Sequence, residues 1–381
     1  MKKFILVIIM FVAFTACDDK DPVPALDTQK EVLVQYSKLV YANYDDAVET
    51  AIAMTQAIET FVGNPSEVTL LAAKNAWLVA RNPYGQSEAF RFYGGPIDDE
   101  NGPEGLINGW PLDESYIDYV VGNTKSGIIN DPTSFPKIDK QTLINANENG
   151  GETNLSTGYH AIEFLLWGQD FNENGPGERP FTDYSITQNA TRRAEYLKVV
   201  TNLLVDNLTE VRDAWETGSV YSTSFINGGE VSLANVLRGI GALSKGELAG
   251  ERMTVALENR DQEDEHSCFS DNTQSDIQMN FIGIENVYKG TYTSSKGIVT
   301  SGYSLSDLVA LANASKNKTV LDLLSQTSLN IEKIPVPFDV ALRAGDPSKN
   351  IENTIISLRK LSDAIVDAGL AIGIQVNAKL D

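Results

Sequence analysis

An apolar stripe near the start of the chain constrains the fold more than any other feature. Between residues 33 and 61, apolar side chains recur in steps of three and four, the period of one face of an α-helix. The stripe spans about eight helical turns and is followed by the helix-ending sequence Gly63-Asn64-Pro65. A helix with such a face buries it against other helices, so the pattern predicts a helical bundle. The stripe consists of Leu33, Tyr36, Val40, Tyr44, Ala47, Ala51, Met54, Ile58 and Phe61.

Further long helices are predicted along the rest of the chain. A second helix is expected to begin at Ser66 and to run toward Phe92, and helical periodicity returns at residues 188–216, 230–260 and 351–365. Several glycines inside residues 230–260 indicate close approach between helices rather than a break. Because no series of alternating strand patterns is present, the sequence predicts an all-α fold.

The predicted helices divide into two helical-bundle domains, residues 28–187 and residues 188–381. Long loops rich in Gly, Pro, Asn and acidic residues are expected in the first domain. An internal echo, in which Ile162-Glu163-x4-Gly168 recurs as Ile284-Glu285-x4-Gly290, suggests that the two bundles are related by duplication. The identities are few, so chance is the other explanation of the echo.

The first 17 residues are typical of a bacterial export signal. A basic start, Met1-Lys2-Lys3, precedes an apolar run from Phe4 to Phe14 that is too short to span a bilayer as a helix. Small residues then lead to Cys17 as in a lipobox, which predicts cleavage before Cys17 and lipidation of its thiol. Residues 18–27 would form a tether. We therefore expect an outer-membrane lipoprotein of the cell envelope, facing the periplasm or the surface; a signal peptide cut elsewhere is the alternative.

Charge and composition exclude several functions. The 381 residues include 30 Lys+Arg and 52 Asp+Glu, a net charge of −22 that repels the phosphates of nucleic acid. Two cysteines cannot build a disulfide framework. Two histidines leave little room for a multi-histidine metal centre. The scarcity of histidine directs the search for a site to His160 and His266.

Each histidine has a carboxylate three residues away. On a helix, His160 and Glu163 would share a face, and Glu263 and His266 have the same spacing. Imidazole and carboxylate ligands suit iron, zinc or manganese, so these four side chains are candidate metal ligands if the two segments meet between the bundles. An acidic chain often gives this spacing by chance, and the alternative is a buried histidine hydrogen-bonded to a nearby acid. The question becomes whether His160 and His266 meet.

A third cluster has helical spacing but an unusual composition. Trp77, Arg81, Tyr84, Glu88 and Arg91 follow one another in steps of four, three, four and three. One helical face made of charges and aromatic rings can line a polar pocket, which makes Arg81 and Glu88 candidate ligand-binding residues. The alternative is an Arg–Glu network that holds two parts of the structure together.

The segment Gly158-x-His160-x-x-Glu163 resembles the signature of the imelysin family, the insulin-cleaving membrane protease group. Three further stretches support the resemblance in the expected order: PYGQSEAFRFYGGPID, LLWGQD with GPGERPFTDY, and EDEHSCFSDNT. The resemblance implies a mainly helical, secreted or envelope-anchored protein of two bundle domains with a link to bacterial iron uptake. The family is classified as a metallopeptidase. The functional positions that the resemblance implies here are Gly158, His160 and Glu163.

The residues themselves give little support to proteolysis. The chain has no His-Glu-x-x-His motif of the helical zinc proteases. His160, Glu163 and His266 match the composition of a metallocarboxypeptidase site, but those enzymes build the site on a mixed sheet that is not predicted here. No residue stands out as the general base that a zinc hydrolase needs.

We therefore expect an accessory protein of iron uptake that binds a ligand or a metal near His160, at the interface of the two bundles. Iron, an iron chelate or zinc would be bound, and other envelope components of iron uptake would be its partners. One alternative is a metallopeptidase that uses His160 and Glu163, with or without His266. Another is a structural or interaction protein in which these residues join the bundles without site chemistry.

Overall fold

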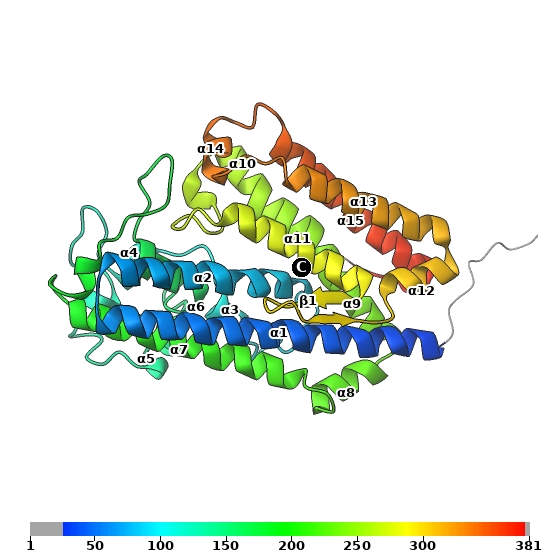
Figure 1. The fold of residues 1–381 in the computed structure, drawn as a ribbon, viewed down its shortest axis with the longest axis horizontal. Coiled ribbons are helices and arrows are strands. Elements are labelled where there is room, and N and C mark those ends of the chain that lie inside the picture. Colours follow the sequence, from blue (N-terminus) through cyan, green and yellow to red (C-terminus); the bar gives the residue numbers. More distant parts are fainter. Residues whose placement is uncertain (1–25, 378–381) are drawn as a thin grey trace, which may run out of the picture.

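The computed structural model describes residues 26–377 (Figure 1). The predicted signal peptide, residues 1–17 with the lipobox Cys17, and most of the tether lie outside the described residues. Within residues 26–377, none of the helices combines the length and apolar character needed to cross a membrane.

The long helix predicted by the apolar stripe is α1, Leu26–Gly63, and every residue of the stripe is buried. The next helix, α2, spans Glu67–Ser87. Its start is fixed by a capping box, because the Ser66 hydroxyl accepts a hydrogen bond from the Thr69 N–H and the Thr69 hydroxyl accepts one from the Ser66 N–H. A 3-10 turn, Glu88–Phe90, follows α2, so the α-helix ends earlier than expected.

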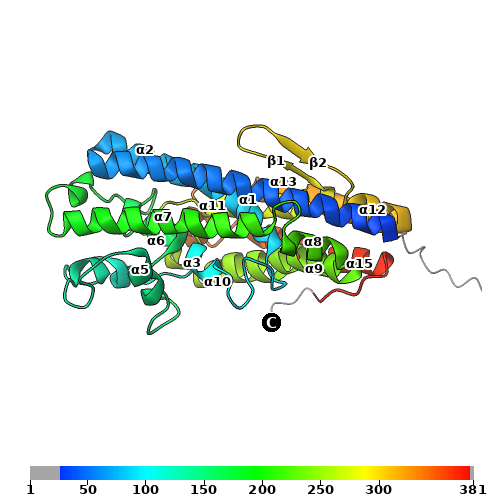
Figure 2. The same ribbon diagram turned by 90° about the horizontal axis from the view of Figure 1, so that it is seen from below.

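Two further helices pack with α1 and α2. Helix α7, Ala190–Ala214, lies along α1 (Figures 1 and 2), and the short helix α6, Gly158–Trp167, contacts both α7 and α2. The expected long loops lie on either side of α6. They contain α3 (Glu104–Ile107), α4 (Glu114–Ile117), α5 (Lys140–Ala146) and the 3-10 turns Ile128–Asn130 and Phe181–Tyr184.

A second group of helices covers α2 from the other side (Figure 1). An antiparallel hairpin of strands β1 (Thr291–Thr293) and β2 (Val299–Ser301) pairs Thr291 with Ser301 and contacts α1. The helices that complete the described chain are α8 (Val220–Asn227), α9 (Glu230–Ala242), α10 (Val255–Asn259), α11 (Thr273–Lys289), α12 (Leu305–Ala312), α13 (Ala314–Ile331), α14 (Phe338–Arg343) and α15 (Asn350–Ala371).

The prediction that residues 230–260 are helical is confirmed, but the middle of this segment is not α-helical. Helix α9 continues into a π-helix, Leu243–Thr254, before α10 begins. Apolar spacing alone does not separate a wider helix from an α-helix over so few turns. Close approach does occur at Gly239, where a Cβ would lie 2.8 Å from the carbonyl oxygen of Ala89.

The two groups of helices meet where α11 lies along α2. A Cβ on Gly85 would lie 2.8 Å from Met279 Cβ, and one on Gly283 would lie 2.2 Å from the carbonyl oxygen of Gln86. Only glycine allows so close an approach. One hydrophobic core runs through both groups. The predicted domain boundary at residue 187 precedes α7, so the prediction assigns α7 to the second domain. In the structure α7 packs on α1, which belongs to the first. The division into two domains and their duplication stay predictions.

Candidate functional site

The helix that carries His160 and Glu163 is buried along its whole length. All ten residues of α6 are buried, so its polar side chains face other protein groups rather than water. The helix begins at Gly158, whose φ is +86°, and a Cβ there would lie 2.6 Å from the carbonyl oxygen of Ile107. Only glycine meets both conditions, which fixes the position of the first turn and of His160 within it.

His160 and His266 meet. The Nε2 atom of His160 lies 3.3 Å from Nε2 of His266, although the residues are 106 positions apart. On its other side, His160 Nδ1 lies 2.8 Å from Glu163 Oε2. Beyond His266, the Nδ1 atom of that ring lies 3.1 Å from Oδ2 of Asp276 on α11. Four side chains therefore form one continuous hydrogen-bonded chain between α6 and α11.

The ends of this chain are held by further hydrogen bonds. Oε1 of Glu163 accepts from the Ser270 N–H at 3.0 Å and from the Ser270 hydroxyl at 2.7 Å. Oδ1 of Asp276 lies 3.2 Å from Nη2 of Arg81 and accepts from the side-chain amide of Asn272 at 3.1 Å. The Ser267 hydroxyl donates to Oδ2 of Asp276 at 2.5 Å. The orientation of both histidines is thus determined by the groups behind them.

Arg81 contacts the Asp276 end of the site. Its Nη1 donates to Asn108 Oδ1 at 2.6 Å, and its guanidinium lies 5.1 Å from the ring centroid of Tyr159. Its Nη2 lies 3.5 Å from His266 Nδ1, at the limit of a hydrogen bond. The candidate Arg81 is therefore brought to the site, where it pairs with Asp276.

Burial has the largest influence on both histidines. It lowers the pKa of His160 well below its ordinary value, and the nearby His266 and Arg81 act in the same direction. It also lowers the pKa of His266, helped by Arg252 and partly opposed by Asp276. Both rings are therefore neutral at physiological pH.

The two carboxyl groups in this series of hydrogen bonds, Glu163 and Asp276, differ in charge. Burial raises the pKa of Glu163 to about 8, although the hydrogen bonds from Ser270 oppose this. Burial would also raise the pKa of Asp276, but the Arg81 guanidinium and His266 hold it well below its ordinary range. Glu163 is thus largely protonated near neutral pH, whereas Asp276 is ionised.

With these protonation states, each of the three hydrogen bonds from Glu163 to Asp276 contains one hydrogen atom. Protonated Glu163 donates from Oε2 to Nδ1 of His160, and His160 donates from Nε2 to Nε2 of His266. His266 then donates from Nδ1 to the Asp276 carboxylate. A metal ion that bound both Nε2 atoms would replace the hydrogen between them.

Glu88 belongs to a neighbouring network. It is bound by Arg252, whose Nη1 donates to Glu88 Oε1 at 3.1 Å, and by Arg91 at 3.4 Å. Burial would raise the pKa of Glu88, but Arg252 lowers it to about 2. Arg252 also pairs with Glu247 at 3.0 Å, five residues before it in the π-helix. Residues five apart share a face of a π-helix, which explains why both side chains reach the same place.

A polar pocket of about 440 Å³ leads to His266. Arg91 and Arg252 line it, and Trp110 lies edge-on to the His266 ring with centroids 5.6 Å apart. Exposed Glu148 and Glu152 among its lining residues open the pocket to water. The other lining residues are Glu104, Gly105, Asn108, Gly109, Leu155 and Glu247.

Glu263, the fourth candidate metal ligand, is not part of this arrangement. It is exposed, and Asp276 occupies the place next to His266 that the sequence assigned to Glu263. The reason is that residues 262–264 form a separate 3-10 turn, and the extended backbone of Glu265 after it ends the helical spacing before His266. Within residues 26–377, no group of three or more His, Cys, Asp or Glu side chains is arranged to hold a metal ion.

Several site residues were missed by the sequence analysis. Asp276, Arg252 and Glu247 lie in no recognisable motif, and Ser270 lies in the stretch EDEHSCFSDNT but was not assigned a role there. The sequence does place an acidic residue, Asp276, ten positions after His266. An acidic chain contains many such pairs, so this spacing alone does not identify a partner of His266. Their roles come from the packing of α11 and the π-helix against α2.

The fold and this site define a helical protein of the imelysin class, and comparisons with known proteins support that conclusion. The Imelysin family model matches residues 40–365, most of the chain, so the chain belongs to the imelysin family. It is 24% identical over 289 residues to "Iron-regulated protein A" of Synechococcus elongatus, an alignment that covers 73% of this chain and 68% of the relative.

Two crystal structures share the fold. A protein described as an iron-regulated protein A precursor, from Parabacteroides distasonis, has a TM-score of 0.73 and 20% identity, and the match covers 93% of this chain and 98% of that one. An imelysin-like protein from Psychrobacter arcticum has a TM-score of 0.68 and 14% identity, covering 94% and 99%. The family, the all-α fold and the relation to an iron-regulated protein are therefore established.

Proposed function

We propose that this chain is a lipoprotein of the outer envelope that assists iron uptake by binding an iron chelate, whose iron is contacted by His160 and His266. The proposal rests on one observation: the two Nε2 atoms face each other at 3.3 Å beside a polar pocket that is open to water. The sequence of residues 1–17 supports the envelope location, and the iron-regulated relative supports the link to iron.

The spacing of the two nitrogens suits a shared metal ion. Two imidazole nitrogens bound at about 2.1 Å in a tetrahedral site lie about 3.4 Å apart. The 3.3 Å separation is close to this value, and it is longer than the usual hydrogen bond to nitrogen. Binding would release the single hydrogen between the rings as a proton, while the Glu163 hydrogen moves to Nδ1 of His160 and keeps that ring neutral. Affinity should therefore rise with pH.

The small number of protein ligands favours a chelate over a bare metal ion. In the described part of the chain, the two histidines are not joined by a third His, Cys, Asp or Glu in metal-binding geometry. A chelate such as ferric citrate brings its own oxygen ligands. Arg91 and Arg252 line the pocket, and the Nε atom of each is buried without a hydrogen-bond partner. These donors suit the oxygen atoms of a carboxylate chelate.

Proteolysis has weaker support. Catalytic zinc sites use three protein ligands and an open position, whereas two histidines converge here. Protonated Glu163 does not point at a free position, because both of its oxygens are engaged by Ser270 and His160.

The decisive experiment measures iron bound from ferric citrate by untagged protein after equilibrium dialysis. We expect His160→Gln and His266→Gln each to lose at least about tenfold in affinity, because each removes one of two protein ligands. Ser362→Ala is the matched control, since it deletes a buried hydrogen bond to Gly241 far along the chain. It should lose stability but bind iron normally. Equal binding by all four proteins would leave only the structural role of the histidines.

The lipid anchor requires its own experiment. Cys17→Ser should leave the precursor unlipidated and shift the protein out of the membrane fraction, while globomycin should block processing of the wild type. A mature N-terminus other than residue 17 would refute the lipoprotein proposal without affecting the iron site.

A further inference from the structure

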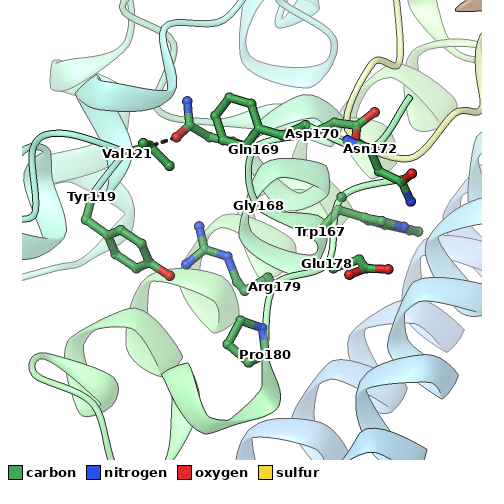
Figure 3. Close-up of a pocket in the computed structure, with 12 residues that line it drawn as sticks. Tyr119, Val121, Trp167, Gly168, Gln169, Asp170, Asn172, Glu178, Arg179 and Pro180 are labelled. Atoms are coloured by element: carbon green, nitrogen blue, oxygen red, sulfur yellow. Dashed lines mark hydrogen bonds between the residues drawn. The ribbon is translucent and has the colours of Figure 1, made fainter. Parts of the chain in front are cut away.

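A second pocket, of about 380 Å³, lies at the C-terminal end of α6 (Figure 3). We call it the Arg179 pocket; it is lined among others by Tyr119, Val121, Trp167, Gln169, Phe171 and Arg179. It is separate from the pocket beside His266, because the two share no lining residue. Nothing in the proposed iron site uses it.

Arg179 lines this pocket, and its guanidinium is held in one position by neighbouring groups. Its central carbon lies 5.3 Å from the ring centroid of Tyr119 and 5.1 Å from that of Phe164, so aromatic rings hold it in place. Its Nη1 donates to Asp118 at 2.8 Å and to Asp183 at 3.2 Å. The Arg179 side chain is only 2% exposed.

The opposite edge of this guanidinium has no partner. Nε of Arg179 is buried without a hydrogen-bond partner, and among residues 26–377 none accepts a hydrogen bond from Nη2. Gly168 lies beside this edge, and a Cβ there would be in ordinary contact with it, 3.5 Å from Nε. The φ of Gly168 is +74°, which also favours glycine. The Nε–Nη2 edge is the planar pair of donors that matches the two oxygens of a carboxylate.

Three large apolar side chains line part of the pocket. Phe171 is 67% exposed and Val121 is 76% exposed, and both line the pocket with Trp167. The Lys74 ammonium lies 5.2 Å from the Trp167 ring centroid and adds positive charge near this end of α6. Of the acidic lining residues, Asp170 accepts a hydrogen bond from the Asn172 N–H, and Glu178 is exposed. Exposed aromatic and aliphatic side chains beside a polar group are typical of a small-molecule site.

We propose that the Arg179 pocket binds a small carboxylic acid with an apolar body. The carboxylate occupies the Nε–Nη2 edge of Arg179, and the apolar body packs against Phe171, Val121 and Trp167. The site is independent of the iron site, so either can fail without the other.

Benzoate is the probe, and benzamide, its neutral isostere, is the control ligand. Isothermal titration calorimetry of the purified protein at pH 7 should give a dissociation constant of about 1 mM for benzoate, as expected of so small a ligand. Benzamide should bind at least about tenfold more weakly, because it lacks the charged pair of acceptors. No heat from benzoate, or equal binding of benzamide, would overturn the proposal.

Variants locate the binding. Arg179→Lys keeps the charge beside Asp118 but removes the two-donor edge, and should weaken benzoate binding roughly tenfold or more. Phe171→Ser leaves that edge intact and should weaken binding about fivefold through lost apolar contact. Ile186→Ser removes another exposed apolar side chain, 81% exposed, and should change nothing. If Phe171→Ser and Ile186→Ser behave alike, benzoate binds elsewhere and the proposal is wrong.

Discussion

Two buried networks of charged and polar groups differ sharply in how they are neutralised. The histidine network joins Glu163, His160, His266, Asp276 and Arg81. The aspartate network joins Asp118, Asp183, Arg179 and Arg193, with Asp118 bound by both arginines. Each contains a carboxylate with no exposure, Glu163 in the first and Asp118 in the second.

The carboxylates of the two networks respond oppositely to burial. Arg193 and Arg179 overcome the effect of burial and lower the pKa of Asp118. Glu163 pairs with no arginine or lysine in the described part of the chain, and burial raises its pKa to about 8. One network is held by fixed charges, and the other by hydrogens that can be exchanged. The second property is the one that a metal site needs, because a metal ion displaces a hydrogen when it binds.

The largest expected effect is in the aspartate network. Asp118→Ala should lower the free energy of unfolding by about 3–5 kcal/mol, because it leaves two buried arginines without their shared partner. Urea denaturation at pH 7 measures this. A loss below about 1 kcal/mol would show that the fixed charges do not hold this region.

Replacing Gly158 tests how α6 is positioned. Gly158→Ala should cost about 2–3 kcal/mol in unfolding free energy, because the alanine combines an unfavourable φ with a Cβ 2.6 Å from a carbonyl oxygen. Gly218→Ala is the matched control, since its φ is +90° but nothing lies within 4 Å of the added Cβ. It should cost only about 1 kcal/mol. Equal costs would mean that the contact with Ile107 does not constrain α6.

The pH dependence of stability separates the two networks directly. A raised pKa in the folded state stabilises the fold at low pH, and this contribution is lost as pH rises from about 4.5 through about 8. Glu163→Gln mimics the protonated acid and should remove this loss. Relative to wild type, it should gain roughly 2–3 kcal/mol between pH 5 and pH 7. Glu59→Gln, at an exposed position, is the control; the same trend in both variants would contradict the assignment to Glu163.

The smallest effect is expected at Glu263. Because this side chain is exposed and Asp276 lies next to His266 instead, Glu263→Gln should change stability by less than about 0.5 kcal/mol. Iron binding from ferric citrate should also be unchanged. A tenfold loss of iron would restore Glu263 as a ligand.

Local patterns predicted the fold better than the site. The apolar stripe predicted α1 and its buried face because neighbours three and four residues apart determine both. The π-helix was missed, since its spacing differs too little from an α-helix. The pair His160–Glu163 was found from three-residue spacing, whereas Asp276 and Arg252 reach the site only through the packing of distant helices. The error at Glu263 has the same cause, because sequence spacing does not show where a loop turns.

The central claim is that His160 and His266 together bind the iron of a chelate. X-ray absorption at the iron edge, on protein loaded with ferric citrate, tests it most directly. We expect nitrogen ligands at about 2.1 Å with the outer scattering of two imidazole rings, reduced to one ring in His160→Gln and in His266→Gln. Iron surrounded only by oxygen, with a spectrum unchanged in both variants, would contradict the claim.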